Sequence, residues 1–372
     1  MNRTVLRPLK FSTLLFTRAI GLDALLARSS WRRDRVLILG YHGVSINREH
    51  DWNPDLYVSQ DMFIRRLELL KKARCAVLPL DEALYRMAKG TLPARTVVIT
   101  FDDGFYDFHQ RAMPVLKGFG FPATVYLTSF YVNAANPVFL LGCSYLFWKH
   151  RKRLLPFLPF HHRSTNFKLG TDAERQTVVQ AIFQWLESVR PTAELQQQAL
   201  RQMAGQLGDD LSEFSERRIL HLMNATEVGE ASEAGFSIQL HTHRHRAPLE
   251  KDLFAREIHQ NRECIKGWTG HSARHFCYPS GEVNSKFFPW LQQQGVQSGV
   301  TCVPGLVSTK DHPLLLPRLV DSSGMSELEF ESWLAGSGAL LRAARGRNRG
   351  WQRDRLITAA WHATIPGLGI QP

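Results

Sequence analysis

Short apolar runs alternate with longer segments of helical periodicity along much of the chain. The runs 36–39, 96–99 and 236–240 are rich in Val, Ile and Leu and are typical of strands buried on both faces. Between the first two, residues 61–72 carry apolar side chains among charges at helical spacing. Strands that alternate with helices are typical of a parallel sheet with crossover helices. The pattern therefore predicts an α/β fold.

This alternation stops between about residues 133 and 225 and resumes afterwards. The interrupted part contains helical segments rich in Gln, Arg and Leu, such as 173–189 and 193–207, and few runs that resemble strands. We therefore expect a helical insertion at about 133–225. From the N-terminus, we predict a basic amphipathic segment at 1–35, the α/β domain with its insertion at 36–330, and a basic C-terminal tail at 331–372.

Composition excludes the disordered and fibrous classes and favours anionic partners. The 372 residues are 44% hydrophobic, enough to bury a full core, and the net charge is +12. Arginines concentrate at both ends, and no motif for DNA or RNA binding is present, so we expect no nucleic-acid partner. Peripheral association with an anionic membrane is the alternative that the basic ends favour.

The N-terminal apolar stretch and the cysteines bear on location. Residues 11–26 are interrupted by polar residues, fall short of a membrane-spanning helix, and lead to no clear signal-peptide cleavage site. They predict an amphipathic helix, either lying on a membrane or packed against the domain. Five cysteines without CxxC spacing indicate neither a disulfide framework nor a thiolate zinc site. We therefore expect a cytoplasmic protein, at the inner face of the membrane if it binds one.

Three predicted strands end in residues that can carry chemistry. Asp102 and Asp103 follow the strand 96–101, and adjacent carboxylates repel each other unless a cation or a proton neutralises one of them. His241 and His245 follow the strand 236–240. One carboxylate and two imidazoles form a common ligand set for a divalent metal.

Each of these signals is weak alone. A buried histidine such as His42, at the end of the first strand, usually completes a hydrogen-bond network, and an aspartate at a strand end often caps the next helix. If the three strands belong to one barrel, however, their carboxyl ends meet at one rim. The sequence therefore predicts a single site at that rim.

Three motifs resemble those of the polysaccharide deacetylases, carbohydrate esterase family 4, which carry a NodB-homology domain. Thr100-Phe101-Asp102-Asp103-Gly104 resembles the first family motif, His241-Thr242-His243-Arg244-His245 the second, and Phe276-Cys277-Tyr278-Pro279-Ser280-Gly281 the third. The resemblance covers roughly residues 36–320. It implies a distorted (β/α)7-type barrel with 133–225 as an insertion, and a metal-dependent hydrolase that removes N-acetyl groups from a glycan.

The resemblance also implies roles for individual residues. Asp103, His241 and His245 would be the ligands of one divalent metal ion, with zinc the first candidate. Asp102 would be the general base that takes a proton from the attacking water, since metals lower the pKa of bound water. The subgroup with its acid histidine on the first strand, which includes the poly-N-acetylglucosamine deacetylases, has a motif like Leu39 to Val44, so His42 would be the general acid.

The third motif departs from the family at two positions. The resemblance implies that the backbone N–H of Ser280 stabilises the oxyanion and that Tyr278 contacts substrate, although Ser280 stands where a tyrosine is usual. Cys277 replaces the arginine that orients the base in many members. Arg318 is a candidate replacement from a neighbouring strand, and an ordinary surface arginine is the competing interpretation.

The expected substrate is an N-acetylhexosamine in a glycan or in a lipid-linked glycan precursor, so the expected partner is an N-acetylated glycan. Three alternatives remain: a hydrolase of the same fold that acts on a non-sugar amide, a catalytically inactive glycan-binding module, and a basic nucleic-acid-binding protein. The last would leave the paired motifs without a purpose. The departure at Cys277 favours the inactive module. Retention of the three ligands, Asp102 and His42 argues against it.

Overall fold

The computed structural model describes residues 3–160 and 166–344 of the chain. Its main sheet has eight strands in the order β11-β10-β9-β6-β5-β1-β12, with β4 paired to β5 outside this path. All the paired strands of this sheet run parallel. The strands are β1 (Leu37–Tyr41), β4 (Ala76–Val77), β5 (Thr96–Asp103), β6 (Thr124–Leu127), β9 (Ser237–Leu240), β10 (His275–Cys277), β11 (Ser298–Val300) and β12 (Leu319–Val320).

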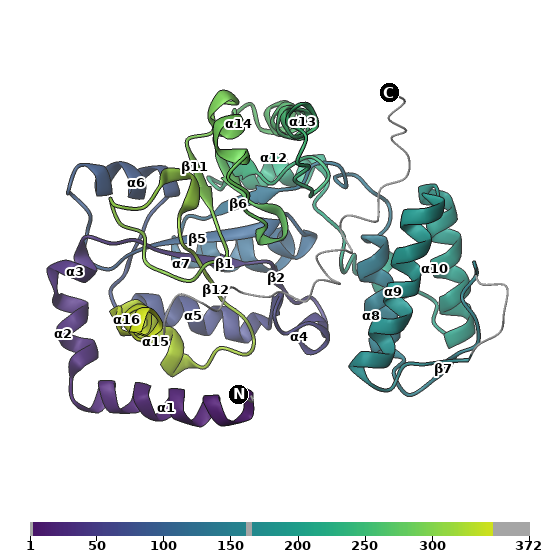
Figure 1. Cartoon of the computed structure of the whole chain (residues 1–372), viewed down its shortest axis with the longest axis horizontal. Coiled ribbons are helices and arrows are strands. Elements are labelled where there is room, and N and C mark those ends of the chain that lie inside the picture. Colours follow the sequence, from purple (N-terminus) through teal and green to yellow (C-terminus); the bar gives the residue numbers. More distant parts are fainter. Residues whose placement is uncertain (1–2, 161–165, 345–372) are drawn as a thin grey trace.

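The sheet curls so that its two ends approach each other. A parallel bridge between Val300 and Leu316 links β11 to the segment that leads into β12. Helices surround the curled sheet (Figure 1), as expected when crossover helices cover a parallel sheet. The prediction of an α/β fold with a distorted (β/α)7-type barrel is confirmed.

The surrounding helices begin and end where the sequence signals predict. Ser59 caps α5 by accepting a hydrogen bond from the backbone N–H of Met62, and Asn224 forms a capping box with Glu227 at the start of α12. A short π-helix, η1, leads into α7, which carries Pro114 in its first turn, where a proline is tolerated. These helices are α5 (Gln60–Lys72), α6 (Leu80–Ala88), η1 (Phe108–Ala112), α7 (Met113–Phe119), α12 (Ala225–Glu233), α13 (Lys251–Thr269) and α14 (Phe287–Gln293).

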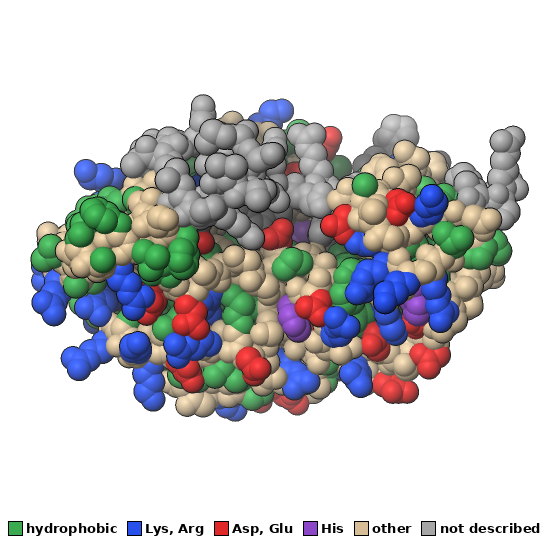
Figure 2. All heavy atoms as spheres, turned by 90° about the horizontal axis from the view of Figure 1, so that it is seen from below, with side chains coloured by type: hydrophobic (Ala, Val, Ile, Leu, Met, Phe, Trp, Pro, Cys, Tyr) green, Lys and Arg blue, Asp and Glu red, His purple; other side chains and the backbone are tan. Residues whose placement is uncertain are grey.

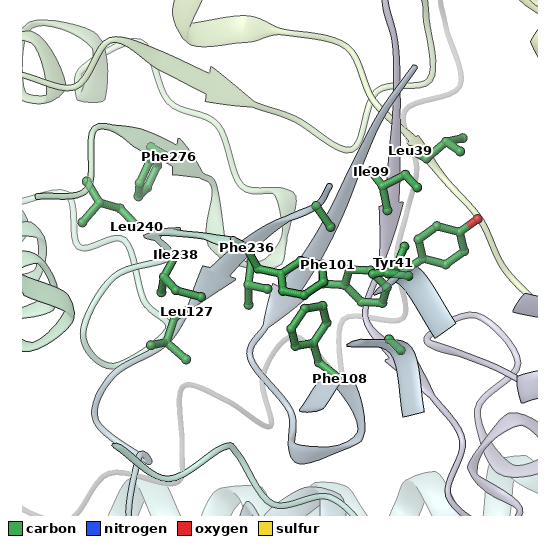
Figure 3. Close-up of a cluster of buried hydrophobic side chains, with 14 of the residues drawn as sticks. Leu39, Tyr41, Ile99, Phe101, Phe108, Leu127, Phe236, Ile238, Leu240 and Phe276 are labelled. Atoms are coloured by element: carbon green, nitrogen blue, oxygen red, sulfur yellow. The ribbon is translucent and has the colours of Figure 1, made fainter. Parts of the chain in front are cut away.

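The central strand β5 is buried along its whole length, as its apolar run predicts. Val97, Ile99 and Phe101 join the main core, while Val98 points to a second cluster on the other face of the sheet. Aromatic rings extend the main core away from β5 (Figure 3): Phe101 lies 4.9 Å from the ring centroid of Phe108 and 5.4 Å from that of Tyr41. This packing fixes the strand whose end carries the paired aspartates.

The helical insertion has a core of its own. Apolar residues from its helices pack together in a cluster that is separate from the barrel core. Figure 1 shows α8, α9 and α10 side by side at one side of the barrel. A short antiparallel pair, β7 with β8, accompanies the helices. The elements are α8 (Phe139–Lys149), β7 (Leu154–Leu155), β8 (Phe167–Lys168), α9 (Asp172–Val189), α10 (Ala193–Leu207) and α11 (Ser212–Ser215).

Smaller elements complete the fold between these parts. Strands β2 and β3 form a separate two-stranded parallel sheet. In the chain, β2 follows β1, and α4 lies between β2 and β3. The remaining elements are α1 (Arg3–Ala19), α2 (Leu22–Arg28), α3 (Ser30–Arg33), β2 (Gly43–Val44), α4 (Glu49–Trp52), β3 (Tyr57–Val58), η2 (Pro279–Gly281), η3 (Pro313–Leu315), α15 (Glu327–Ala335) and α16 (Ser337–Ala344).

The C-terminal boundary differs from the prediction at residue 330, because α15 runs across it. Trp333 and Leu334 are buried in the barrel core, so the first residues of the predicted basic tail pack against the barrel. Residues 345–372, which hold most of the tail arginines, lie outside the described residues. Among the helices of the described ranges, none has the length and apolar character to cross a bilayer.

Candidate active site

The chain reverses sharply at the end of β5, next to the paired aspartates. Asp103 has a φ of 69° and Gly104 a φ of 83°, both in the left-handed region. A Cβ atom at Gly104 would lie 2.2 Å from Leu127 Cδ1, so only glycine fits. The backbone N–H of Thr128, just after β6, donates to the Asp103 carbonyl at 3.1 Å. The turn is therefore anchored to the neighbouring strand.

Asp103, His241 and His245 converge on one point. The Nε2 atoms of His241 and His245 lie 3.1 and 3.2 Å from Asp103 Oδ1, and one ligand atom of each residue lies within 4.8 Å of the others. All three side chains are buried. The Nδ1 of His241 is hydrogen-bonded to the Cys277 carbonyl at 2.8 Å, which leaves Nε2 for a metal. This donor set fits a divalent ion held by one carboxylate and two imidazoles.

A second group with the same compactness contains Asp102, His241 and Cys277. It is the weaker candidate for a metal. Asp102 is already occupied by an arginine, described below, and burial raises the pKa of Cys277 well above its usual value. A thiol that keeps its proton is a poor ligand.

Asn261 of α13 holds the loop after β9, which carries His241 and His245, against the end of β6. Its Oδ1 accepts a hydrogen bond from the backbone N–H of His241 at 3.0 Å, and its Nδ2 donates to the Leu127 carbonyl at 2.9 Å and to Ser129 Oγ at 2.8 Å. Asn261 is fully buried. Both positions it links belong to strands that end at the site, so Asn261 sets their relative position.

Asp102 lies between a histidine and an arginine. The Nε2 of His42 is 3.5 Å from Asp102 Oδ2, and Arg318 donates two hydrogen bonds to the same carboxylate, at 2.6 and 2.7 Å. Burial would raise the pKa of Asp102, but the charge and hydrogen bonds of Arg318, helped by His42 and His241, lower it well below its usual value. Asp102 is therefore ionised at neutral pH and held in a fixed orientation.

Arg318, the candidate replacement for the third-motif arginine, is the arginine that contacts Asp102. It is fully buried, so the interpretation as a surface arginine is wrong. Its guanidinium lies 3.3 Å from Cys277 Sγ. A Cβ atom at Gly40 would lie 3.0 Å from Arg318 Nε. Because residues 40 and 277 are small, they leave space for the side chain of Arg318, which immediately precedes β12, to reach Asp102.

The third-motif turn holds the two predicted substrate-binding residues. Tyr278 is buried, its hydroxyl donates to the Leu314 carbonyl at 2.8 Å, and its ring packs edge-on against Phe276. These contacts favour a packing role for Tyr278 over the predicted contact with substrate. Ser280 has a φ of 60°, and its buried hydroxyl has no hydrogen-bond partner among the described residues. Its position in a strained turn agrees with a role in the site.

One aromatic side chain that the sequence reasoning missed lies beside the histidine motif. Phe130 is 38% exposed, and its backbone N–H donates to the His243 carbonyl at 2.8 Å. The guanidinium of Arg244 lies 5.3 Å from the ring centroid of Phe130 and is bonded to the buried Glu257. Its place three positions after the end of the apolar strand β6 is the signal that could have identified it, since the rim at the strand ends carries function.

A model of the polysaccharide deacetylase family matches residues 89–155 and 213–299. This chain carries a polysaccharide deacetylase domain. The match includes the ends of β5, β6, β9 and β10, with all three predicted metal ligands and Asp102. The unmatched residues 156–212 of the deacetylase domain lie within the helical insertion. The resemblance that the motifs predict is confirmed.

Curated relatives of the deacetylase domain include proteins called poly-beta-1,6-N-acetyl-D-glucosamine N-deacetylase. The one from Staphylococcus aureus is 37% identical over 79 residues, which is 21% of this chain and 27% of that protein. The one from Staphylococcus epidermidis is 33% identical over an equal length and equal shares. The match thus spans about a quarter of the length of these relatives.

Solved structures resemble the chain over a larger part. The deacetylase PplD from Streptococcus pyogenes, in complex with acetate, has a TM-score of 0.53 at 19% identity, covering 81% of this chain and 97% of that one. IcaB from Ammonifex degensii has a TM-score of 0.52 at 17% identity, covering 82% and 98%. At these identities the similarity establishes the fold, which is that of the deacetylase barrel.

Proposed function

We propose that the protein is a metal-dependent N-deacetylase acting on an N-acetylhexosamine in a glycan or a lipid-linked glycan precursor. One observation carries the proposal: Asp103, His241 and His245 meet at a point beside an ionised Asp102 that is flanked by His42. This is the arrangement that hydrolysis of an amide requires, with a cation site, a base and an acid together. The names of the staphylococcal relatives support the choice of N-acetylglucosamine polymers as first substrates.

A divalent ion at Asp103, His241 and His245, with zinc the first candidate, would supply Lewis-acid activation of water and of the acetyl carbonyl. Asp102, ionised and oriented by Arg318, accepts the proton of the attacking water. His42 donates a proton to the amide nitrogen as the C–N bond breaks, because an amine leaves poorly without one. We assign the stabilisation of the oxyanion to the backbone N–H of Ser280, which lies in the turn after β10. The products are acetate and a free amino sugar.

The test is metal content by elemental analysis together with acetate release from an N-acetylglucosamine oligomer. We expect about one equivalent of metal, acetate release that a chelator abolishes, and a loss of at least about a thousandfold in kcat for Asp102→Asn. Asp55→Asn, at an exposed carboxylate outside the site, is the matched control and should keep full activity.

Two other outcomes would replace the proposal. Release of acetate from small N-acetyl amides, with none from sugar oligomers, would show a non-sugar amidase of the same fold. Binding of the oligomer without any acetate release, at full metal loading, would show an inactive glycan-binding module.

We also propose that the protein works in the cytoplasm, at the inner face of an anionic membrane. The net charge of +12 and five free cysteines support this location. In fractionated cells, the protein should sediment with membranes and be released by about 0.5 M salt, which screens surface charge. Recovery in the soluble fraction at low salt, or in a secreted fraction, would contradict this.

A further inference from the structure

The first two helices expose an unusual number of large apolar side chains. Phe11, Leu15 and Phe16 of α1, Ile20 after it, and Leu25 of α2 are between 46% and 69% exposed. We call these five residues the α1–α2 apolar surface. Figure 2, which views the molecule from the side of α1, shows hydrophobic side chains gathered at one edge, with Lys and Arg side chains beside them.

Among the described side chains of α1, at residues 11–19, the outward positions carry little of the charge that a water-exposed helix normally has. Leu14 and Thr17 are buried on the inner side, where α1 contacts α15. The exposed positions in the described side chains of α1 are Phe11, Ser12, Leu15, Phe16, Arg18 and Ala19. Arg18 alone among them is charged, and it pairs with Glu331 at 2.5 Å. A helical segment such as 11–19, which is apolar on both its inner and its outer side, is expected to have a partner on each side.

Positive charge borders this surface. Arg28 and Arg33 are exposed on α2 and α3, and Lys72 and Arg74 are exposed at the end of α5. The two regions are neighbours, because the guanidinium of Arg95 donates to the carbonyls of both Ala27 and Ala73. Asp34, beside Arg33, and Glu68, one turn before Lys72, are exposed acids in this border.

We infer that the α1–α2 apolar surface inserts into the interfacial layer of an anionic bilayer, with α1 lying in the membrane plane. Apolar side chains flanked by Arg and Lys are what binding to acidic lipids requires, because burial and charge attraction act together. A second copy of the chain is the competing occupant. Like positive borders would repel each other across a symmetric contact, so the charge favours the bilayer.

The experiment is co-sedimentation of the full chain with phosphatidylglycerol vesicles and with phosphatidylcholine vesicles at low salt. We expect binding to the first and at least about tenfold weaker binding to the second. Phe16→Asp with Leu25→Asp should weaken binding to the anionic vesicles about tenfold or more, since two inserted side chains are replaced by charges that lipid repels.

Matched variants test whether vesicle binding depends on the α1–α2 apolar surface or on the overall charge and hydrophobicity of the chain. Val189→Asp with Leu195→Asp, at exposed apolar positions of the insertion, should leave vesicle binding unchanged. Arg28→Glu with Lys72→Glu should reduce binding at low salt, whereas Lys251→Glu with Arg256→Glu on α13 should reduce it much less. Figure 1 shows α13 on the opposite side of the barrel from α1.

Equal binding by the α1–α2 variant and the insertion variant would overturn the inference. So would a concentration-dependent dimer that the Phe16→Asp and Leu25→Asp variant loses while vesicle binding persists. Vesicle binding is measured without substrate, so failure of the proposed deacetylase activity and failure of this inference are separate results.

Discussion

Two buried arginine–aspartate pairs lie in different parts of this barrel and differ in their surroundings. Arg318 and Asp102 sit at the mouth, with His42 and the predicted metal ligands beside them. Arg66 of α5 and Asp321, just after β12, sit in the wall, joined at 2.9 Å and bonded also to Tyr41 and the Met325 carbonyl. All four charged side chains are at most 3% exposed.

The surroundings shift the pKa values of Asp321 and Asp102 in opposite directions. Burial raises the pKa of Asp321, and Arg66 offsets only part of that rise. At Asp102 the charge of Arg318 and the nearby histidines outweigh burial, and the pKa falls. The same pair of residue types therefore ties a helix to the sheet in one place and maintains an ionised, oriented base in the other.

The largest expected effect comes from breaking the wall pair. Arg66→Gln leaves Asp321 buried without its ion partner, which should lower the free energy of unfolding by about 3–5 kcal/mol. Urea unfolding checks this, and kcat should be nearly unchanged at a temperature where the variant is folded. Replacing both partners, Arg66→Met with Asp321→Leu, should recover most of the stability.

Breaking the mouth pair should act on catalysis. Arg318→Gln removes the bidentate support of Asp102, so kcat should fall about a hundredfold with little change in KM. Arg318→Lys should recover only part of this loss, because an ammonium cannot reproduce the two parallel hydrogen bonds. Equal losses of kcat in Arg66→Gln and Arg318→Gln, both fully folded, would contradict the division of roles.

A smaller effect is expected at the rim of the mouth. If the exposed ring of Phe130 stacks on the sugar, Phe130→Ala should raise KM for the oligomer about three- to tenfold and leave kcat within about twofold. Phe130→Tyr should retain the stacking. Phe157→Ala, at an exposed phenylalanine of the insertion, is the control. An unchanged KM in Phe130→Ala would exclude the ring from substrate binding.

The smallest effect is expected at the ion pair between the half-exposed Asp81 of α6 and His275 of β10. The hydrogen bond from His275, supported by Arg274, lowers the pKa of Asp81. A carboxyl group whose pKa is lowered in the folded state stabilises the folded protein at pH values above its unfolded pKa of about 3.9. That stabilisation is lost as the pH falls. Asp81→Asn should therefore cost no more than about 1 kcal/mol at pH 7, since solvent screens the pair. The difference between the urea midpoints of the two proteins should narrow progressively as the pH falls below about 3.9.

The sequence predicted those residues of the candidate site that directly follow an apolar run. Asp102 and Asp103 follow an apolar run, as do His241 and His245, and the parallel arrangement brings such ends to one rim. Asn261 carried a weaker signal, because it is a polar residue on the buried face of α13. The packing role of Tyr278 had none, because its hydroxyl partner lies 36 positions away.

The sequence alone determined the alternation of strands and helices, the helical insertion and the set of side chains able to bind a metal, since each depends on local periodicity or residue type. The tertiary structure decided which arginine faces Asp102. That choice depends on space: Gly40 and Cys277 are small, and Arg318 enters between them from a segment more than two hundred positions from Asp102. It also decided which apolar side chains of residues 11–19 in α1 stay exposed, because only the packing against α15 shows which side of this segment is covered.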